Sequence, residues 1–187
     1  AVQVLALNTL GVLYLVSDGT CAAASFDDLK GQTVYAPAQN PSFIFQYLCE
    51  KNGLKPGEDI IIDTTYAQPA DLNAAVSSGE VSLAVLPEPM VTIACAANSA
   101  LSVAMDLTAE WDKVSPAGSL VQGCVVVRTE FAKEHAAELK CFLDEYRASV
   151  EALSADVQGT AEKIQETGIF AKAAVAAKAI PNCNVCF

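Results

Sequence analysis

The sequence is poor in the residues that most often carry catalysis. Among 187 residues it has one histidine, one tryptophan and two arginines. The only histidine, His135, lies among charged residues at the start of an expected amphipathic helix, where we expect a solvated side chain. No GxSxG, HExxH or P-loop motif is present. The sequence therefore predicts a protein that is not an enzyme and that has no catalytic residues, metal site or cofactor.

Basic residues are also scarce, with 11 lysines and arginines against 22 aspartates and glutamates, a formal net charge of −11. Nucleic acids and anionic membranes are bound by basic patches, so this balance argues against both as partners. No apolar run reaches the roughly 18 residues of a membrane-spanning helix. The apolar segment 2–16 is interrupted by Asn8, Thr9 and Gly11, and no basic residue precedes it. We expect two strands there, or a strand and a short helix, and no signal peptide.

Cysteine, in contrast, is abundant, with seven residues at scattered positions. Cys49, Cys124 and Cys141 occupy apolar positions of expected helices or strands, which is typical of small core residues. The Cys183–Cys186 pair forms a CxxC motif without a second pair or nearby histidines, a poor zinc signal. A structural or incidental role, a disulfide, and metal or redox chemistry all remain open for this pair.

The segment 26–89 alternates short β-rich runs with helical runs. Strands are expected at 31–36, 59–63 and 81–86, the second of them covered on both faces because its centre is almost wholly apolar. Asn40 followed by Pro41 is typical of a helix start, and Gly53 of its end. This alternation predicts a parallel sheet that receives a ligand at its loop end, near a helix N-terminus.

Several motifs occur in an order and spacing that resemble one protein family over nearly the whole chain. They are DLKG at 28–31, KNGL at 51–54, SGEV at 78–81, LPEP at 86–89, LTAEW at 107–111, QGCVVV at 122–127 and FAKEH at 131–135. Together they resemble the solute-binding proteins of ABC transporters, in the nitrate/sulfonate/taurine-type group. Ser82 departs from that pattern, since the group often has aspartate at this position.

This resemblance implies an α/β fold of the two-lobe, periplasmic-binding-protein type II kind. Each lobe is expected to be a mainly parallel sheet flanked by helices. Residues 1–28 and 120–187 would form lobe I and residues 29–119 lobe II. The chain is short for the group and begins without methionine, so we expect an N-terminally truncated sequence whose first lobe is incomplete, with the signal segment outside it.

The ligand would lie in a cleft between the lobes, outside the carboxyl ends of the strands. The expected ligand-binding residues are uncharged groups in loops and at strand ends, with one carboxylate: Asn8, Thr9, Gln39, Asn40, Ser42, Tyr66, Gln68 and Glu88. An ordinary capped turn is the alternative at Gln39–Ser42, and loop packing is the alternative for Tyr66 and Gln68. Glu88 would meet either a cationic group of the ligand or a neighbouring lysine.

The resemblance implies an extracytoplasmic protein, periplasmic or lipid-anchored as a lipoprotein, that hands a small molecule or oxyanion to an ABC permease. No arginine lies near the predicted loop, which favours a neutral or weakly charged organic ligand. Two alternatives remain open: an enzyme of the same fold resembling those of thiamine-pyrimidine synthesis, and the effector-sensing domain of a transcription regulator. A homodimer through an exposed sheet edge is also expected for a truncated chain.

Overall fold

The computed structural model describes residues 1–187 and divides them into two compact units. Unit 1 comprises residues 1–11 and 120–187, and unit 2 comprises residues 12–119. Residues 12–28 were expected in the first lobe. The structure places them in unit 2, because their strand pairs on both sides with other strands of that unit.

Unit 2 contains a five-stranded sheet in the order β4-β3-β5-β2-β6. Its strands are β2 (Leu13–Ser17), β3 (Thr33–Tyr35), β4 (Ile61–Asp63), β5 (Leu83–Pro87) and β6 (Ser102–Asp106). β3 pairs in parallel with both β4 and β5, while β2 is antiparallel to β5 and β6. Consequently β3, β4, β5 and β6 all end at one edge of the sheet, which we call the carboxyl edge. β2 begins there.

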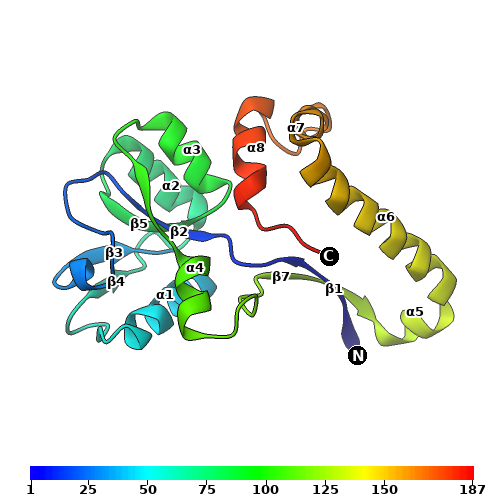
Figure 1. The fold of residues 1–187 in the computed structure, drawn as a ribbon, viewed down its shortest axis with the longest axis horizontal. Coiled ribbons are helices and arrows are strands. Elements are labelled where there is room, and N and C mark those ends of the chain that lie inside the picture. The colour runs from blue at the N-terminus through cyan, green and yellow to red at the C-terminus, as the bar shows by residue number, and fades with distance from the viewer. The chain divides into compact units, whose positions relative to one another are not determined.

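Helices cover both faces of this sheet (Figure 1). The helices are α1 (Asn40–Lys51), α2 (Pro69–Ser78), α3 (Met90–Ala97) and α4 (Leu107–Val114), with a 3-10 turn at Asp27–Leu29. One buried cluster joins α1 and α4 to Leu13 and Leu15 of β2, and the other joins α2 and α3 to Tyr14 and Val16. Alternate residues of β2 therefore fill opposite cores, as the pleat of a strand requires.

Unit 1 is built on two strands, β1 (Val2–Thr9) and β7 (Gly123–Arg128). They pair antiparallel, with irregular register after Val4 and after Leu7. This differs from the mainly parallel sheet expected for that lobe. The unit continues with helices, which are α5 (Thr129–Glu134), α6 (Ala136–Ala155), α7 (Val157–Glu166), α8 (Ala173–Ala179) and the 3-10 turn Ile180–Asn182. None of the helices in the structure combines the length and hydropathy needed to cross a bilayer.

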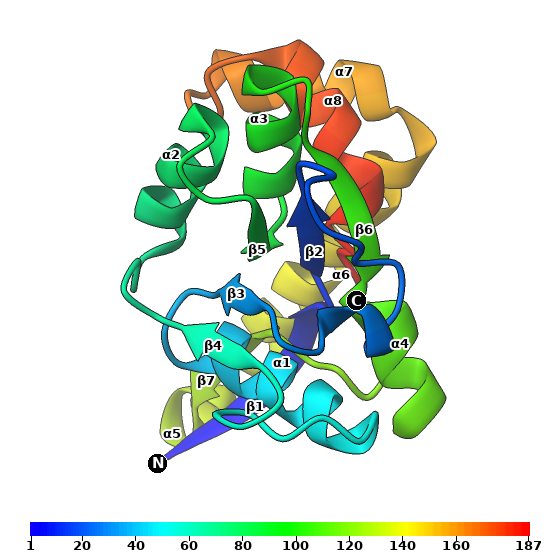
Figure 2. The same ribbon diagram turned by 90° about the vertical axis from the view of Figure 1, so that its left-hand side faces the viewer.

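Three local expectations were wrong. β4 is an edge strand beside β3 (Figure 2), and Ile61 is 56% exposed, so the apolar run at 59–63 is not covered on both faces. Cys124 and Cys141 are exposed, not core residues, because the strand β7 and the helix α6 that carry them leave those positions uncovered. Cys49 is buried as expected, and the structure joins none of the seven cysteines in a disulfide.

Candidate ligand-binding site

The strand order of unit 2 reverses direction between β3 and β5. From β3 the chain passes through α1 to β4 at the edge of the sheet, and then returns through α2 to β5 on the other side of β3. In open α/β sheets, ligands bind at such a reversal, outside the carboxyl ends of the strands. The loop after β3 carries Gln39 and the residue after β5 is Glu88, so two predicted site residues flank the reversal.

The N-terminus of α1 presents backbone groups at this edge. Gln39 precedes the helix, and its carbonyl oxygen accepts hydrogen bonds from the Phe43 N–H at 3.0 Å and from the Ser42 hydroxyl at 2.9 Å. Pro41 in the first turn has no N–H to offer. Gln39 and Asn40 are exposed, and Gln39 has a φ of 67°, which is unusual for a residue other than glycine.

A pocket of about 390 Å³ lies between the first half of α1 and the edge strand β4. Its walls contain no charged side chain. They combine amides and hydroxyls with apolar groups: Ala38, Gln39, Ser42, Phe43, Gln46, Pro56, Gly57, Ile61, Ile62 and Thr64. Phe43 is 64% exposed, so an aromatic ring faces solvent beside the predicted polar residues. The volume is in the range of small-molecule sites.

Carboxylates follow three of the four strands that end at the carboxyl edge. Asp63 ends β4, Glu88 follows β5 and Asp106 ends β6. Each is bound by its own chain: Asp63 by the N–H of Thr65, Glu88 by Thr92, and Asp106 by the N–H groups of Thr108 and Ala109. Hydrogen bonds from Thr65 hold the pKa of the Asp63 carboxyl below its ordinary value, so that group is ionised at neutral pH.

Tyr66 and Gln68 lie in the loop between β4 and α2. The Tyr66 hydroxyl donates to Glu80 Oε1 at 2.8 Å, and its ring contacts that of Tyr35 with centroids 5.9 Å apart. The carboxylate of Glu80 raises the pKa of the Tyr66 hydroxyl through this hydrogen bond. The exposed Gln68 precedes α2, and its carbonyl accepts from Asp71 and Leu72. Neither residue lines the pocket described above.

Asn8 and Thr9 belong to unit 1, at the end of β1. The backbone carbonyl of Asn8 accepts from Cys186 and that of Thr9 from Gln122, each within about 3.1 Å. Asn8 Oδ1 is buried without a hydrogen-bond partner, and a Cβ at Gly123 would lie 2.2 Å from it. Any side chain at position 123 would clash with this amide, so the position requires glycine. A ligand role for Asn8 and Thr9 stays a prediction.

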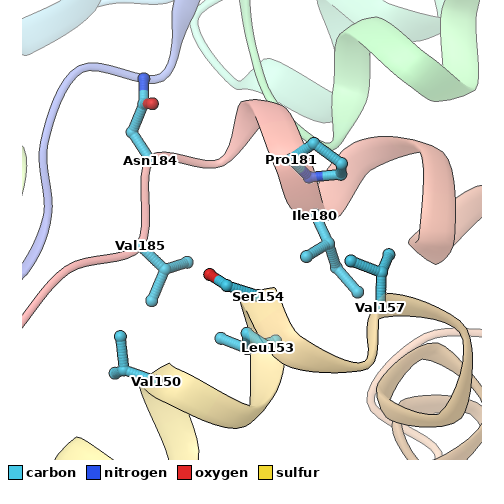
Figure 3. Close-up of a pocket in the computed structure, with 8 residues that line it drawn as sticks. All are labelled: Val150, Leu153, Ser154, Val157, Ile180, Pro181, Asn184 and Val185. Atoms are coloured by element: carbon cyan, nitrogen blue, oxygen red, sulfur yellow. The ribbon is translucent and has the colours of Figure 1, made fainter.

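Unit 1 has its own pocket of about 330 Å³ between α6 and the C-terminal segment (Figure 3). Valine, leucine, isoleucine and proline form most of its wall, and Ser154 contributes a hydroxyl. The Asn184 amide points away from these apolar groups and donates to the carbonyl of Gly11. A wall of this composition offers little polar recognition. None of the predicted site residues lines it.

Solved structures of similar shape include periplasmic binding proteins. An ABC transporter protein from Parabacteroides distasonis is similar over 98% of this chain and 60% of its own, with 24% identity and a TM-score of 0.78. The periplasmic aliphatic sulphonate binding protein SsuA from Escherichia coli is similar over 99% of this chain and 60% of its own, with 16% identity and a TM-score of 0.76. The periplasmic nitrate-binding protein NrtA from Synechocystis is similar over 88% of this chain and 44% of its own, with 14% identity and a TM-score of 0.59.

The chain has the fold of periplasmic solute-binding proteins. It spans about 60% of the length of the first two of these structures. No family description matches the sequence, and no curated protein does. The expected fold class is confirmed by this likeness.

Several polar residues of the pocket wall and of the carboxyl edge were not among the site residues predicted from the sequence. They are Gln46 and Thr64 in the pocket wall, the carboxylates of Asp63 and Asp106, and the partners Thr65 and Thr92. Asp63 and Asp106 each end a strand, and a carboxylate directly before a helix or turn is a signal for capping. Gln46 gave no signal, because one exposed glutamine on a helix is an ordinary surface residue.

Proposed function

We propose that this protein is the solute-binding component of an ABC importer. It captures a small molecule at the carboxyl edge of unit 2, outside the cytoplasm, and delivers it to a membrane permease. The observation that carries the proposal is the reversal of strand order between β3 and β5, flanked by Gln39 and Glu88, in a fold otherwise found in proteins that bind sulphonates and nitrate.

The pocket beside α1 supports a binding role. Gln39, Ser42, Gln46 and Thr64 supply hydrogen-bonding groups, and Phe43 supplies an apolar contact. Small-molecule sites combine a mostly apolar wall with a few polar groups in this way. The proposed ligand contacts are those named from the sequence, of which Gln39 and Ser42 line this pocket.

The enzyme alternative finds no support at this edge. His135 lies in unit 1, stacked on the Phe131 ring with centroids 4.2 Å apart, and its Nδ1 is 3.5 Å from Glu138 Oε1. The carboxylates of the edge are bound to backbone N–H groups and hydroxyls of their own chain. The Ser42 hydroxyl in the pocket wall donates to the carbonyl of Gln39 and not to a general base.

Binding can be tested by thermal shift and isothermal titration with nitrate, alkanesulfonates, taurine, pyrimidines and amino acids. A specific ligand raises the apparent stability by mass action. Gln39→Ala and Ser42→Ala should weaken binding of the ligand found, whereas Ser99→Ala, at the opposite edge of the sheet, should leave it unchanged. Binding that is equal in all four proteins would place the site elsewhere, and no binding by any compound would contradict the proposal.

Delivery to a permease needs a separate test. The protein, with and without the ligand found, is added to its permease and ATPase partners reconstituted in lipid vesicles. We expect ATP hydrolysis to rise only when protein and ligand are both present. ATP hydrolysis at the same rate with and without the protein would contradict a transport role, but it would not affect the conclusion about binding.

A further inference from the structure

The charges of unit 2 are distributed unevenly between the two edges of its sheet. The carboxyl edge carries Asp63, Glu88 and Asp106. The unit has four lysines and no arginine, and each lysine contacts another side chain of the unit. Lys30 lies 3.6 Å from Asp59, Lys55 lies 3.4 Å from Glu58, Lys113 lies 2.6 Å from Glu110, and Lys51 lies over the Tyr47 ring.

The topology explains this distribution. Lys30 precedes β3 and Lys55 precedes β4, so both lie toward the edge where these parallel strands begin. Lys51 and Lys113 lie in the last turns of α1 and α4, which start at the carboxyl edge and run back from it. The carboxyl edge of unit 2 therefore carries the carboxylates of Asp63, Glu88 and Asp106. Its nearest ammonium group, that of Lys113, is paired with Glu110 in the first turn of α4.

Helix N-termini do not offset these charges. The Glu88 carboxylate occupies the N-terminus of α3, and the Asp106 carboxylate occupies that of α4. α2 has Asp71 in its first turn. α1 has no acidic residue there, but Pro41 removes one N–H and the Phe43 N–H is bound to Gln39. Few backbone donors are left for a bound anion.

We propose that the site of unit 2 takes an organic molecule without net negative charge that presents N–H or O–H donors, such as an amide or an amine, and that it rejects oxyanions. This inference rests on the proposed function and narrows it. The uncharged wall beside α1 binds the body of the ligand, with Phe43 against its apolar part. The edge carboxylates make a negative potential that opposes sulfonate or nitrate. This separates the protein from the sulphonate-binding and nitrate-binding proteins whose fold it shares.

The test compares compounds that share a scaffold and differ in the charge of one group. Benzenesulfonate, benzamide and benzylamine form one such set, and butanesulfonate, butyramide and butylamine another, with nitrate added alone. The intact 187-residue chain is titrated with each compound in a thermal-shift assay at pH 7 and low salt. We expect amides or amines to raise the melting temperature, and we expect sulfonates and nitrate to leave it unchanged at the same concentrations.

Variants that add a charge test whether the ligand binds at the pocket beside α1. Gln39→Lys and Thr64→Lys each add one positive charge at the pocket wall, where both side chains face solvent. Each should weaken amine binding about tenfold and strengthen sulfonate binding by a similar factor. Ser99→Lys adds the same charge at the opposite edge and is the matched control, which should behave as the unmodified chain.

The outcomes separate the two proposals. Binding of a sulfonate or nitrate to the unmodified chain at the affinity of the amide or better would overturn this inference and support the binding function. Binding of the amide or amine alone, altered by Gln39→Lys but not by Ser99→Lys, would support both. If neither these sets nor the wider compound panel stabilises the chain, the proposed function fails and the inference fails with it.

Discussion

The carboxylate of Glu88 binds Thr92 twice, accepting the backbone N–H at Oε2 over 3.2 Å and the hydroxyl at Oε1 over 2.9 Å. Thr92 is in the first turn of α3, so this carboxylate caps the helix that directly follows β5. Glu88 is only 8% exposed. A buried charge needs such partners, because unpaired it would lose its hydration without compensation.

Replacing Glu88 should therefore reduce stability. Glu88→Ala leaves the N–H and hydroxyl of Thr92 without their acceptor and removes the helix cap, and we expect the free energy of unfolding to fall by about 2 kcal/mol. Urea denaturation, followed by the fluorescence of the single tryptophan, Trp111, measures it. Glu80→Ala is the control: Glu80 is exposed and accepts one side-chain hydrogen bond, from Tyr66, so its loss should cost less than about 1 kcal/mol. Equal losses in the two variants would argue against a buried cap.

Gln39 should show a conflict between stability and binding. Its φ of 67° is a conformation that glycine adopts more readily than residues with a Cβ. Gln39→Gly should raise the free energy of unfolding by about 1 kcal/mol and at the same time weaken binding of the ligand found, since the amide is lost. Asn40→Gly, one residue further into the helix, relieves no such strain and should destabilise slightly. A destabilised Gln39→Gly variant would show that the side chain has a structural role.

The buried thiol of Cys49 should make the free energy of unfolding fall as the pH becomes alkaline. Burial raises the pKa of its thiol to about 12, from an ordinary value of 9.0. In the unfolded chain the thiol ionises near pH 9 while the folded protein keeps its proton. The stabilisation that comes from keeping this thiol protonated is therefore complete below pH 9. It is lost between about pH 9 and 12, by up to about 1.4 kcal/mol for each pH unit.

The measurement is urea denaturation at several pH values under reducing conditions, with Cys49→Ala as the control that lacks this ionisation. Above pH 9, the free energy of unfolding of the control should fall less steeply with pH than that of the unmodified protein. Alkylation gives a second check, since the exposed Cys124 and Cys141 should react in the native protein and Cys49 only on unfolding. Rapid alkylation of Cys49 in the native state would contradict its burial.

The sheet of unit 1 should promote self-association. Val4 and Val126 are direct cross-strand neighbours, 60% and 55% exposed. β7 has one unpaired edge, and the outer edge of β1 is bridged only at its end, between Thr9 and Val185. Exposed apolar strands with free edges pair with other chains. Light scattering should show a mass that rises with concentration, and Val4→Lys with Val126→Lys should lower it. The control is Val103→Lys, on the edge strand β6 of unit 2. A concentration-independent monomer would contradict this prediction.

The order of elements in unit 2 could be predicted because its signals are local. Proline and asparagine at the start of α1, glycine after α1 and α2, and short β-branched runs between them each act over a few residues. The capping role of Glu88 was not predicted, although its partner Thr92 is only four residues away and α3 begins two residues after Glu88.

The sequence by itself determined the alternation of strands and helices, the acidic balance and the likeness to solute-binding proteins, because periodicity and composition are properties of neighbouring residues. Only the tertiary structure decided that β2 belongs to unit 2, that β4 lies at the sheet edge with Ile61 exposed, and that three strand-end carboxylates share one edge of the sheet. These facts depend on which strands pair over long stretches of chain, and pairing is set by packing of both sheet faces together.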